Sequence, residues 1–318
     1  RSAFYLMYQK DTGRWEFTVP REAAAGTVTW LTARSVTVPA LNRWTHLAGV
    51  YDATAGQLTL YVDGVAEGVR AGVTSLPSAG PFRIGRSQSG GRFDGAISDV
   101  RAWNRALPVT EVSDRTVAWW NFDGASVDSS RFGRGTSLTS LGTSYTADGK
   151  GLALDGDGCA EGYGPALRTD RSWTVAARVG LAAVLENRTV ISQSGPARDA
   201  FYLQYHKDYK KWAVLVPSSV DGTPVWKQAL STAAPALNTW THLTAVYDAQ
   251  ALTLTLYVNG AAQVTTTGVV APASTGRIHI GCSGSGGRFS GTIDDVRLYA
   301  SALPAADVVK LAAGTVVR

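Results

Sequence analysis

The sequence predicts an all-β protein built from tandem antiparallel β-sandwich jelly rolls. Apolar and polar residues alternate over short segments almost everywhere, which is the pattern of half-buried strands. Two of these segments end in Asp63-Gly64 and Asn259-Gly260, and such dipeptides are the strongest local signal of a β-hairpin. In addition, one sequence block is written twice within 318 residues, a length that fits two domains.

The two copies of the block keep a constant offset along the chain. Leu41–Leu47 matches Leu237–Leu243, and Gly90–Gly95 matches Gly286–Gly291 at the same spacing. A period this long indicates two whole domains rather than a stack of short repeats. We therefore interpret the repeat as a domain duplication.

The first copy lacks the opening part of the second. Arg1–Leu6 matches Arg198–Leu203, so the segment that begins near Trp119 has no counterpart in the first copy. We expect residues 1–115 to form the C-terminal part of a first jelly roll, with its opening strands absent from this chain. Residues 116–318 are expected to form a complete second jelly roll. Either an upstream segment or another copy of the chain would then complete the first, because exposed strand edges and apolar faces find partners.

The period-two segments predict the strands in chain order, and helical periodicity is nearly absent. In the first copy the expected strands are Phe4–Tyr8, Trp15–Val19, Trp44–Tyr51, Leu58–Val62, Phe82–Gly85 and Ile97–Trp103. In the second copy they include Trp119–Phe122, Leu152–Leu154, Trp173–Val179, Thr189–Gln193 and Leu252–Val258. Short helical turns are expected after Pro108 and after Pro304. Strands of this length and spacing are typical of two antiparallel sheets packed face to face.

Composition and charge exclude several classes of function. The net charge is +5 and only 17% of residues are charged, with arginines scattered singly rather than clustered. A solvated surface explains this balance, so nucleic acid is not an expected partner. No apolar run reaches about eighteen residues, and no membrane span is expected.

The chain has two cysteines, Cys159 and Cys282, and both belong to the second copy. They are either a disulfide or two unrelated buried thiols. Their spacing fits no zinc pattern. A disulfide would agree with an oxidising, extracellular compartment. The first-copy counterpart of Cys282 is Arg86, so any such bond is confined to the second domain.

Six motifs of the second copy form a characteristic set when taken together and in order. They are Trp120–Asp123, Leu152–Gly156, Thr169–Val179, Trp240–Leu243, Tyr257–Gly260 and Ile293–Tyr299. As a set they resemble laminin-G-like jelly-roll domains of the concanavalin A-like lectin/glucanase superfamily, in the tandem form of secreted actinobacterial proteins. The resemblance covers the second copy from end to end and the second half of the family's pattern in the first copy.

The resemblance makes glycoside hydrolysis a possibility to test, because the superfamily includes laminarinase-type glycosidases. Those enzymes are similar to one another in a Glu-x-Asp-x-x-Glu strand that supplies the two carboxylates. The six glutamates of this chain include no such pair. His46 and His242 occupy equivalent strand positions and are interpreted as structural. We therefore expect a protein that is not an enzyme.

The resemblance also implies one structural Ca²⁺ ion in the second domain. In the family, such an ion is held by oxygens of the first strand, of a carbonyl near the second strand and of the last strand. The matching positions are Asp123, Gly156 and Asp294, whereas the first copy has Ser98 in place of Asp294. Hard oxygen ligands from both ends of a domain would tie its outer strands together. The alternative is that Asp123, Asp155 and Asp157 are ordinary turn residues next to glycine.

Aromatic residues supply the candidate ligand-binding site. Alternation places Tyr202 and His206 on the strand face opposite Phe201. Tyr209 and Trp226 follow them in the sequence and are also candidate ligand-binding residues. Trp30 is the candidate ligand-binding residue of the first copy. Sugar recognition uses exposed aromatic rings beside planar polar groups. We expect a non-catalytic recognition module of a larger secreted bacterial protein, with a glycan or cell-surface polymer as partner. The alternative is an architectural spacer or a protein–protein interaction domain.

Overall fold

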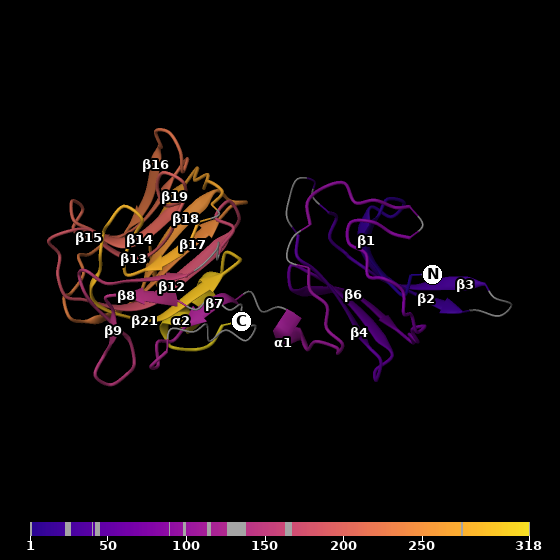
Figure 1. Ribbon diagram of the computed structural model, residues 1–318. Coiled ribbons are helices and arrows are strands. Elements are labelled where there is room, and N and C mark those ends of the chain that lie inside the picture. Colours follow the sequence, from indigo (N-terminus) through magenta and orange to yellow (C-terminus); the bar gives the residue numbers. More distant parts are fainter. Residues whose placement is uncertain are drawn as a thin grey trace. The chain divides into compact units, whose positions relative to one another are not determined.

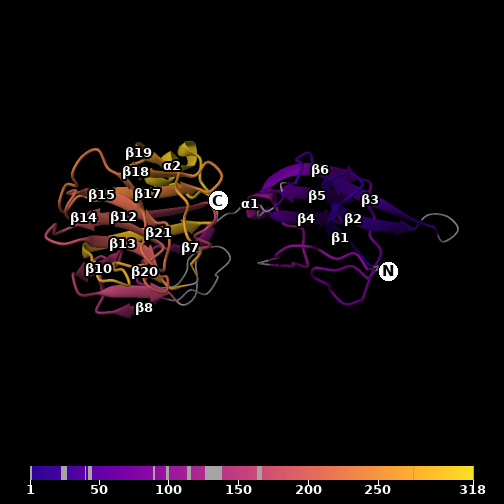
Figure 2. The same ribbon diagram turned by 90° about the horizontal axis from the view of Figure 1, so that it is seen from above.

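The computed structural model divides the chain into two compact units, Arg1–Asp114 and Arg115–Val317. The structure describes all residues except 1, 23–26, 40, 42–44, 89, 98–99, 113–115, 126–137, 163–166, 275 and 318. Figures 1 and 2 show that strands make up nearly all of the regular secondary structure of both units. The fold class predicted from the sequence is therefore confirmed.

The second unit is a sandwich of two antiparallel sheets, and its larger sheet has eight strands. Seven of them follow one path, and β7 (Thr116–Trp120) pairs with β21 beside it. Along the path the strands are β19 (Ala261–Thr267), β18 (Thr253–Val258), β17 (Trp240–Asp248), β12 (Trp173–Leu181), β21 (Ser290–Tyr299), β10 (Leu152–Asp155) and β9 (Ser144–Tyr145).

The second sheet of this unit has seven strands. In spatial order they are β16 (Trp226–Leu230), β15 (Lys211–Pro217), β14 (Phe201–His206), β13 (Arg188–Gln193), β20 (Ile278–Ile280), β11 (Cys159–Gly162) and β8 (Leu138–Leu141). Sequence neighbours β13 to β16 form a meander, whereas β20 and β11 come from opposite ends of the unit.

The core of the second unit fills the space between these sheets. Trp173 lies at its centre, with ring centroids 4.8 Å from Phe201 and 5.7 Å from Tyr247. Strand alternation sends Phe201, Leu203 and Tyr205 inward, all of them buried. Helix α2 (Ala305–Ala312), expected after Pro304, packs on the opposite face of the eight-stranded sheet. The face of the seven-stranded sheet that points away from the core is called the outer face below.

The first unit contains two three-stranded sheets around a small core. The sheets are β1 (Tyr5–Gln9), β2 (Arg14–Glu22) and β3 (Val28–Arg34), then β4 (Leu47–Asp52), β5 (Gln57–Val62) and β6 (Val65–Ala71). Phe17, Leu31 and Leu60 belong to the core. A single helical turn, α1 (Val109–Val112), follows Pro108 as expected. Trp44, at the start of one expected strand, lies outside the described residues.

Two strands expected in the first unit do not form. Phe82–Gly85 is not a strand, and neither are the described residues of Ile97–Trp103, of which residues 98 and 99 lie outside the description. Their counterparts in the second unit are β20 and β21, which pair with β7, β10, β11, β12 and β13. All five of those partners precede the repeated block. A segment with strand propensity needs partner strands beside it, and the described first-unit residues contain no counterparts of these five strands.

The exposure of the side chains in these segments also differs between the two units. Phe82, Ile84 and Ile97 are 57%, 56% and 46% exposed, whereas the isoleucines at the corresponding second-unit positions are all completely buried. The same positions are therefore core residues in one unit and surface residues in the other. None of the helices formed by the described residues has the length and apolar character needed to cross a membrane.

Candidate functional site

Aromatic side chains gather on the outer face of the seven-stranded sheet, over β14, β15 and β16. Because Phe201 points into the core, its neighbour Tyr202 points outward. The strand register places Tyr202 opposite Leu215, and Leu215 opposite Gln228. One row of side chains thus crosses three strands on this face.

Tyr202 and Trp226 form the first ring pair of the site. Their centroids are 5.9 Å apart, and the ring planes are inclined by 52°. Tyr202 is buried beneath the pair, and its hydroxyl oxygen accepts a hydrogen bond from the Asp199 backbone N–H at 3.1 Å. Burial raises the pKa of Tyr202, so its hydroxyl stays protonated at neutral pH. Trp226 keeps 41% of its surface exposed and can accept a ligand.

His206 and Tyr209 form the second ring pair, with centroids 4.4 Å apart. Gln228 Nε2 donates a hydrogen bond of 3.2 Å to the Tyr209 hydroxyl and so links this pair to the row that contains Tyr202. Burial lowers the pKa of His206, which keeps its imidazole neutral at physiological pH. Tyr202, His206, Tyr209, Trp226 and Gln228 are together called the aromatic surface. Sequence reasoning proposed the four rings and missed Gln228, which lies two residues beyond Trp226 on the same strand face.

Trp30 occupies the equivalent place in the first unit. It lies on β3, and its ring centroid is 5.1 Å from that of Tyr5. Tyr5 and Trp30 are the repeat counterparts of Tyr202 and Trp226, so both units keep the Tyr–Trp pair. The His–Tyr pair is not repeated, because the corresponding first-unit residues are Gln9 and Thr12. The aromatic surface is therefore more extensive in the second unit.

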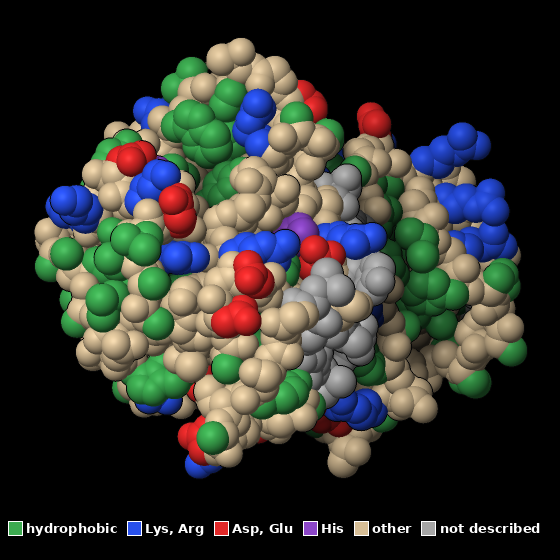
Figure 3. Space-filling model, turned by 60° about the vertical axis from the view of Figure 1, so that its left-hand side comes forward, with side chains coloured by type: hydrophobic (Ala, Val, Ile, Leu, Met, Phe, Trp, Pro, Cys, Tyr) green, Lys and Arg blue, Asp and Glu red, His purple; other side chains and the backbone are tan. Residues whose placement is uncertain are grey.

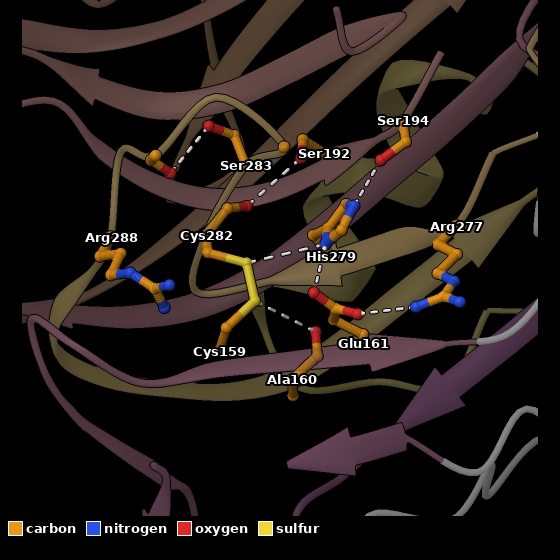
Figure 4. Close-up of a disulfide and its surroundings, with 12 residues drawn as sticks. Cys159, Ala160, Glu161, Ser192, Ser194, Arg277, His279, Cys282, Ser283 and Arg288 are labelled. Carbon is orange, nitrogen blue, oxygen red and sulfur yellow. Dashed lines mark hydrogen bonds and ion pairs between the residues drawn. A yellow bond between two sulfur atoms is a disulfide. The ribbon is translucent and has the colours of Figure 1, made fainter. Parts of the chain in front are cut away.

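A cavity of about 500 Å³ opens on the same outer face, beside the two cysteines. The structure joins Cys159 and Cys282 as a disulfide, which connects β11 to the residues after β20. The strand register continues the row of outward side chains from Tyr202 through Ser192 and His279 to Glu161. Figure 4 shows His279 next to both Glu161 and the disulfide.

A second cavity, of about 670 Å³, lies against the eight-stranded sheet. Trp240 lines it and is 40% exposed, with the Arg178 guanidinium 4.6 Å from the ring centroid. Asn238 and Thr292 add polar groups to its wall. Sequence reasoning assigned Trp240 only to a strand, although its alternation with Thr241 already places it on the face opposite the core. The molecular face drawn in Figure 3 shows hydrophobic side chains exposed in patches, with Lys and Arg side chains beside several of them.

The structure brings together only part of the expected calcium site. Asp294 lies close enough to Asp123 for the charge of the Asp123 carboxylate to help raise the pKa of Asp294. Gly156 does not join them. The antiparallel pairing of β10 with β21 sets Asp155 opposite Ser290, four residues from Asp294 and thus about 13 Å along the strand. A cation held by Asp123 and Asp294 stays a prediction.

Asp294→Asn is expected to raise the free energy of unfolding by about 1–2 kcal/mol at pH 8 in the presence of a chelator. Burial raises the pKa of Asp294 to about 6, and the carboxylates of Asp295 and Asp123 act in the same direction. Protonation of Asp294 therefore stabilises the folded protein. This stabilisation is fully present below the ordinary pKa of an aspartate and is lost as the pH rises through about 6. Denaturant titrations at pH 8 and pH 4 measure the difference, which should vanish at pH 4. An equal effect at both pH values would contradict this account, and stabilisation of the wild type alone by Ca²⁺ would place the cation there.

His242, interpreted as structural, is buried in β17. Its Nδ1 lies 3.4 Å from Thr244 Oγ1. Burial lowers the pKa of His242 to about 4, which keeps the imidazole neutral. It lines neither of the two cavities described above.

Comparison of the sequence with models of known protein families finds one matching family. A family model for the concanavalin A-like lectin/glucanases superfamily matches residues 2–113 and 155–309. No curated protein matches the chain.

Several solved structures are similar in fold at low identity. Domain 4 of AbnA, a GH43 extracellular arabinanase from Geobacillus stearothermophilus solved with arabinotriose, is 20% identical with a TM-score of 0.49, over 62% of this chain and 98% of that one. The botulinum neurotoxin serotype G binding domain is 13% identical with a TM-score of 0.47, over 62% of this chain and 50% of that one. Trypanosoma rangeli sialidase is 14% identical with a TM-score of 0.46, over 65% of this chain and 33% of that one. The chain therefore spans about half of the neurotoxin domain and a third of the sialidase.

Proposed function

Since the chain belongs to the concanavalin A-like lectin/glucanases superfamily, we propose that it is a non-catalytic recognition module of a larger secreted bacterial protein and that it binds carbohydrate. The observation that carries the proposal is the aromatic surface: two ring pairs on one sheet face, with the Gln228 amide hydrogen-bonded to the Tyr209 hydroxyl. The partner is a glycan or a cell-surface polymer.

The chemistry of this surface suits a sugar ring. Trp226 and Tyr209 each leave 41% of their surface exposed, so each can stack on the apolar C–H face of a sugar. Gln228 carries a carbonyl oxygen and an amide N–H, the planar polar group that hydroxyls of a sugar can pair with. The rings are held in place by packing on Tyr202 and His206, which lowers the entropic cost of binding.

The arrangement of the carboxylates favours binding over catalysis. A glycosidase needs two carboxyl groups facing one reacting centre. The carboxylate with a strongly raised pKa, Asp294, lines neither cavity described above. Four of the six glutamates are held by basic side chains: Glu16 by Arg34, Glu111 by Arg105, Glu161 by Arg277 and Glu186 by Lys207. The disulfide supports the secreted location, because such bonds persist in oxidising compartments.

A glycan array screened with and without a chelator tests the proposed function. We expect one or more glycans to bind, and Trp226→Ala to weaken their binding by about tenfold to a hundredfold, as loss of a central aromatic contact does. Trp240→Ala is the matched control, because Trp240 is equally exposed but lies on the other sheet. Loss of binding in Trp240→Ala alone would move the site to the second cavity. A silent array would contradict the proposal and favour the architectural spacer.

A further inference from the structure

Four potential metal ligands converge around the disulfide. One atom each from Cys159, Glu161, His279 and Cys282 lies within 4.8 Å of the other three. The first two residues come from β11, His279 comes from β20, and Cys282 follows β20. Figure 4 shows the imidazole and the carboxylate directed toward the two sulfurs. The group combines two soft ligands, one imidazole and one carboxylate, which is a ligand set that Zn²⁺ accepts.

We propose that this cluster is a zinc site when the disulfide is reduced. The ligands are the Sγ atoms of Cys159 and Cys282, Nδ1 of His279 and a carboxylate oxygen of Glu161. In the oxidised protein the two sulfurs bind each other. In the reduced protein one Zn²⁺ ion takes the place of the S–S bond and holds β11 against the residues after β20.

The geometry already approaches that of a tetrahedral site. His279 Nδ1 lies 3.7 Å from Cys282 Sγ and 3.4 Å from Glu161 Oε1. Ligands at zinc distances of about 2.0–2.3 Å are separated from one another by about 3.3–3.8 Å in a tetrahedron. Only small side-chain adjustments are therefore required once the sulfurs separate.

Neighbouring groups orient the ligands. His279 Nε2 forms a hydrogen bond with Ser194 Oγ, so a proton carried on Nε2 leaves the Nδ1 lone pair free for the metal. Arg277 Nη1 lies 3.2 Å from the second carboxylate oxygen, Glu161 Oε2. Two thiolates and one carboxylate exceed the zinc charge by one, and the guanidinium offsets that excess. Both cysteines and His279 are buried, as in closed structural sites, and the adjoining cavity gives access.

The conversion balances with a dithiol as reductant. Two electrons and two protons pass from the dithiol to the disulfide, which gives two cysteine thiols and leaves the reductant as a disulfide. Zn²⁺ then binds the two sulfurs as thiolates and releases the two thiol protons to solvent. No other co-reactant is needed.

The site is confined to the second unit. The first-unit counterparts of His279 and Cys282 are Arg83 and Arg86, which do not bind Zn²⁺. The stoichiometry should therefore be one zinc per chain. Sequence spacing indicated no zinc pattern, because Cys159 and Glu161 lie far along the chain and reach His279 only through the pairing of β11 with β20.

Zinc content after reduction tests the proposal. The full chain is reduced with a phosphine, incubated with ZnCl₂ and separated from unbound metal. Its zinc content is then measured by elemental mass spectrometry. We expect one zinc per reduced chain and none in the oxidised chain. Co²⁺ in place of zinc should give the visible absorption of a tetrahedral site with a sulfur charge-transfer band. A reduced chain that binds no zinc would overturn the proposal, whether it is folded or not.

Substitutions of single residues distinguish a four-ligand zinc site from binding of zinc by the two thiols alone. His279→Gln should weaken zinc binding by at least about tenfold and Ser194→Ala by about tenfold, as loss of a ligand and of its orienting partner does. His46 is an exposed histidine of the first unit, so His46→Gln is the matched control and should bind zinc as tightly as the wild type. The disulfide of each variant can still form, so folding is verified in the oxidised state. Equal zinc affinity of His279→Gln and the wild type would overturn the assignment.

Discussion

Replacing Cys159 with serine is expected to lower the free energy of unfolding of the second unit by about 3–5 kcal/mol. The disulfide closes a loop between residues separated by 123 positions. Removal of a crosslink restores chain entropy to the unfolded state, and a loop of about 100 residues corresponds to about 4.7 kcal/mol in the chain-entropy treatment. Denaturant unfolding in the presence of a chelator, so that no metal replaces the bond, measures the loss.

Three matched measurements check the cause of this loss. Cys282→Ser and reduction of the wild type should each reproduce the effect of Cys159→Ser. The double variant should be no less stable than either single variant, because both substitutions remove one bond. A change below about 1 kcal/mol, or additive losses in the double variant, would contradict the view that the bond stabilises the unit.

Trp173→Ala is the second substitution with a large expected effect, a loss of about 3–5 kcal/mol in the free energy of unfolding. The indole is buried between the sheets against Phe201 and Tyr247, and its Nε1 donates a hydrogen bond of 3.2 Å to the Thr169 carbonyl. Alanine would leave a cavity at the centre of the sandwich and an unpaired carbonyl oxygen. Denaturant unfolding followed by circular dichroism measures the loss.

Trp226→Ala is the matched control for Trp173→Ala, because it removes the same side chain from the surface. It should change the free energy of unfolding by less than about 1 kcal/mol. Trp173→Phe should recover part of the stability by refilling some of the space. Similar losses for Trp173→Ala and Trp226→Ala would mean that the core is not where the structure places it.

The sequence predicts the sandwich because its signals are local. Alternation identifies β12 and β13, and Asn259-Gly260 marks the turn between β18 and β19. The same local signals fail for Phe82–Gly85, whose pattern matches that of β20 but whose described residues form no strand. Pairing is a property of two segments, and in the second unit the partners of β20 are β11 and β13. A strand therefore cannot be predicted from its own residues alone.

The residues of the candidate site likewise fall into those that the local sequence predicts and those that depend on strand pairing. The ring pairs could be anticipated in part, because Tyr202 and His206 share a strand face of β14 and Tyr209 follows in the turn directly after that strand. The contribution of Gln228 depends on the register of β16, and the Cys159–His279 cluster depends on strands from opposite ends of the unit. Gly156 of the expected calcium set lies away from Asp294, because the antiparallel direction of β10 along β21 carries it toward Ser290.

The central claim is that the aromatic surface binds carbohydrate, and tryptophan indole N–H signals in NMR spectra test it most directly. Oligosaccharides that bind on the array are titrated into the labelled full chain, and the Trp226 signal is assigned from the spectrum of Trp226→Phe. We expect the Trp226 signal to shift with saturation while that of the buried Trp173 stays in place. A saturable shift confined to Trp240, or no shift of any indole signal, would contradict the claim.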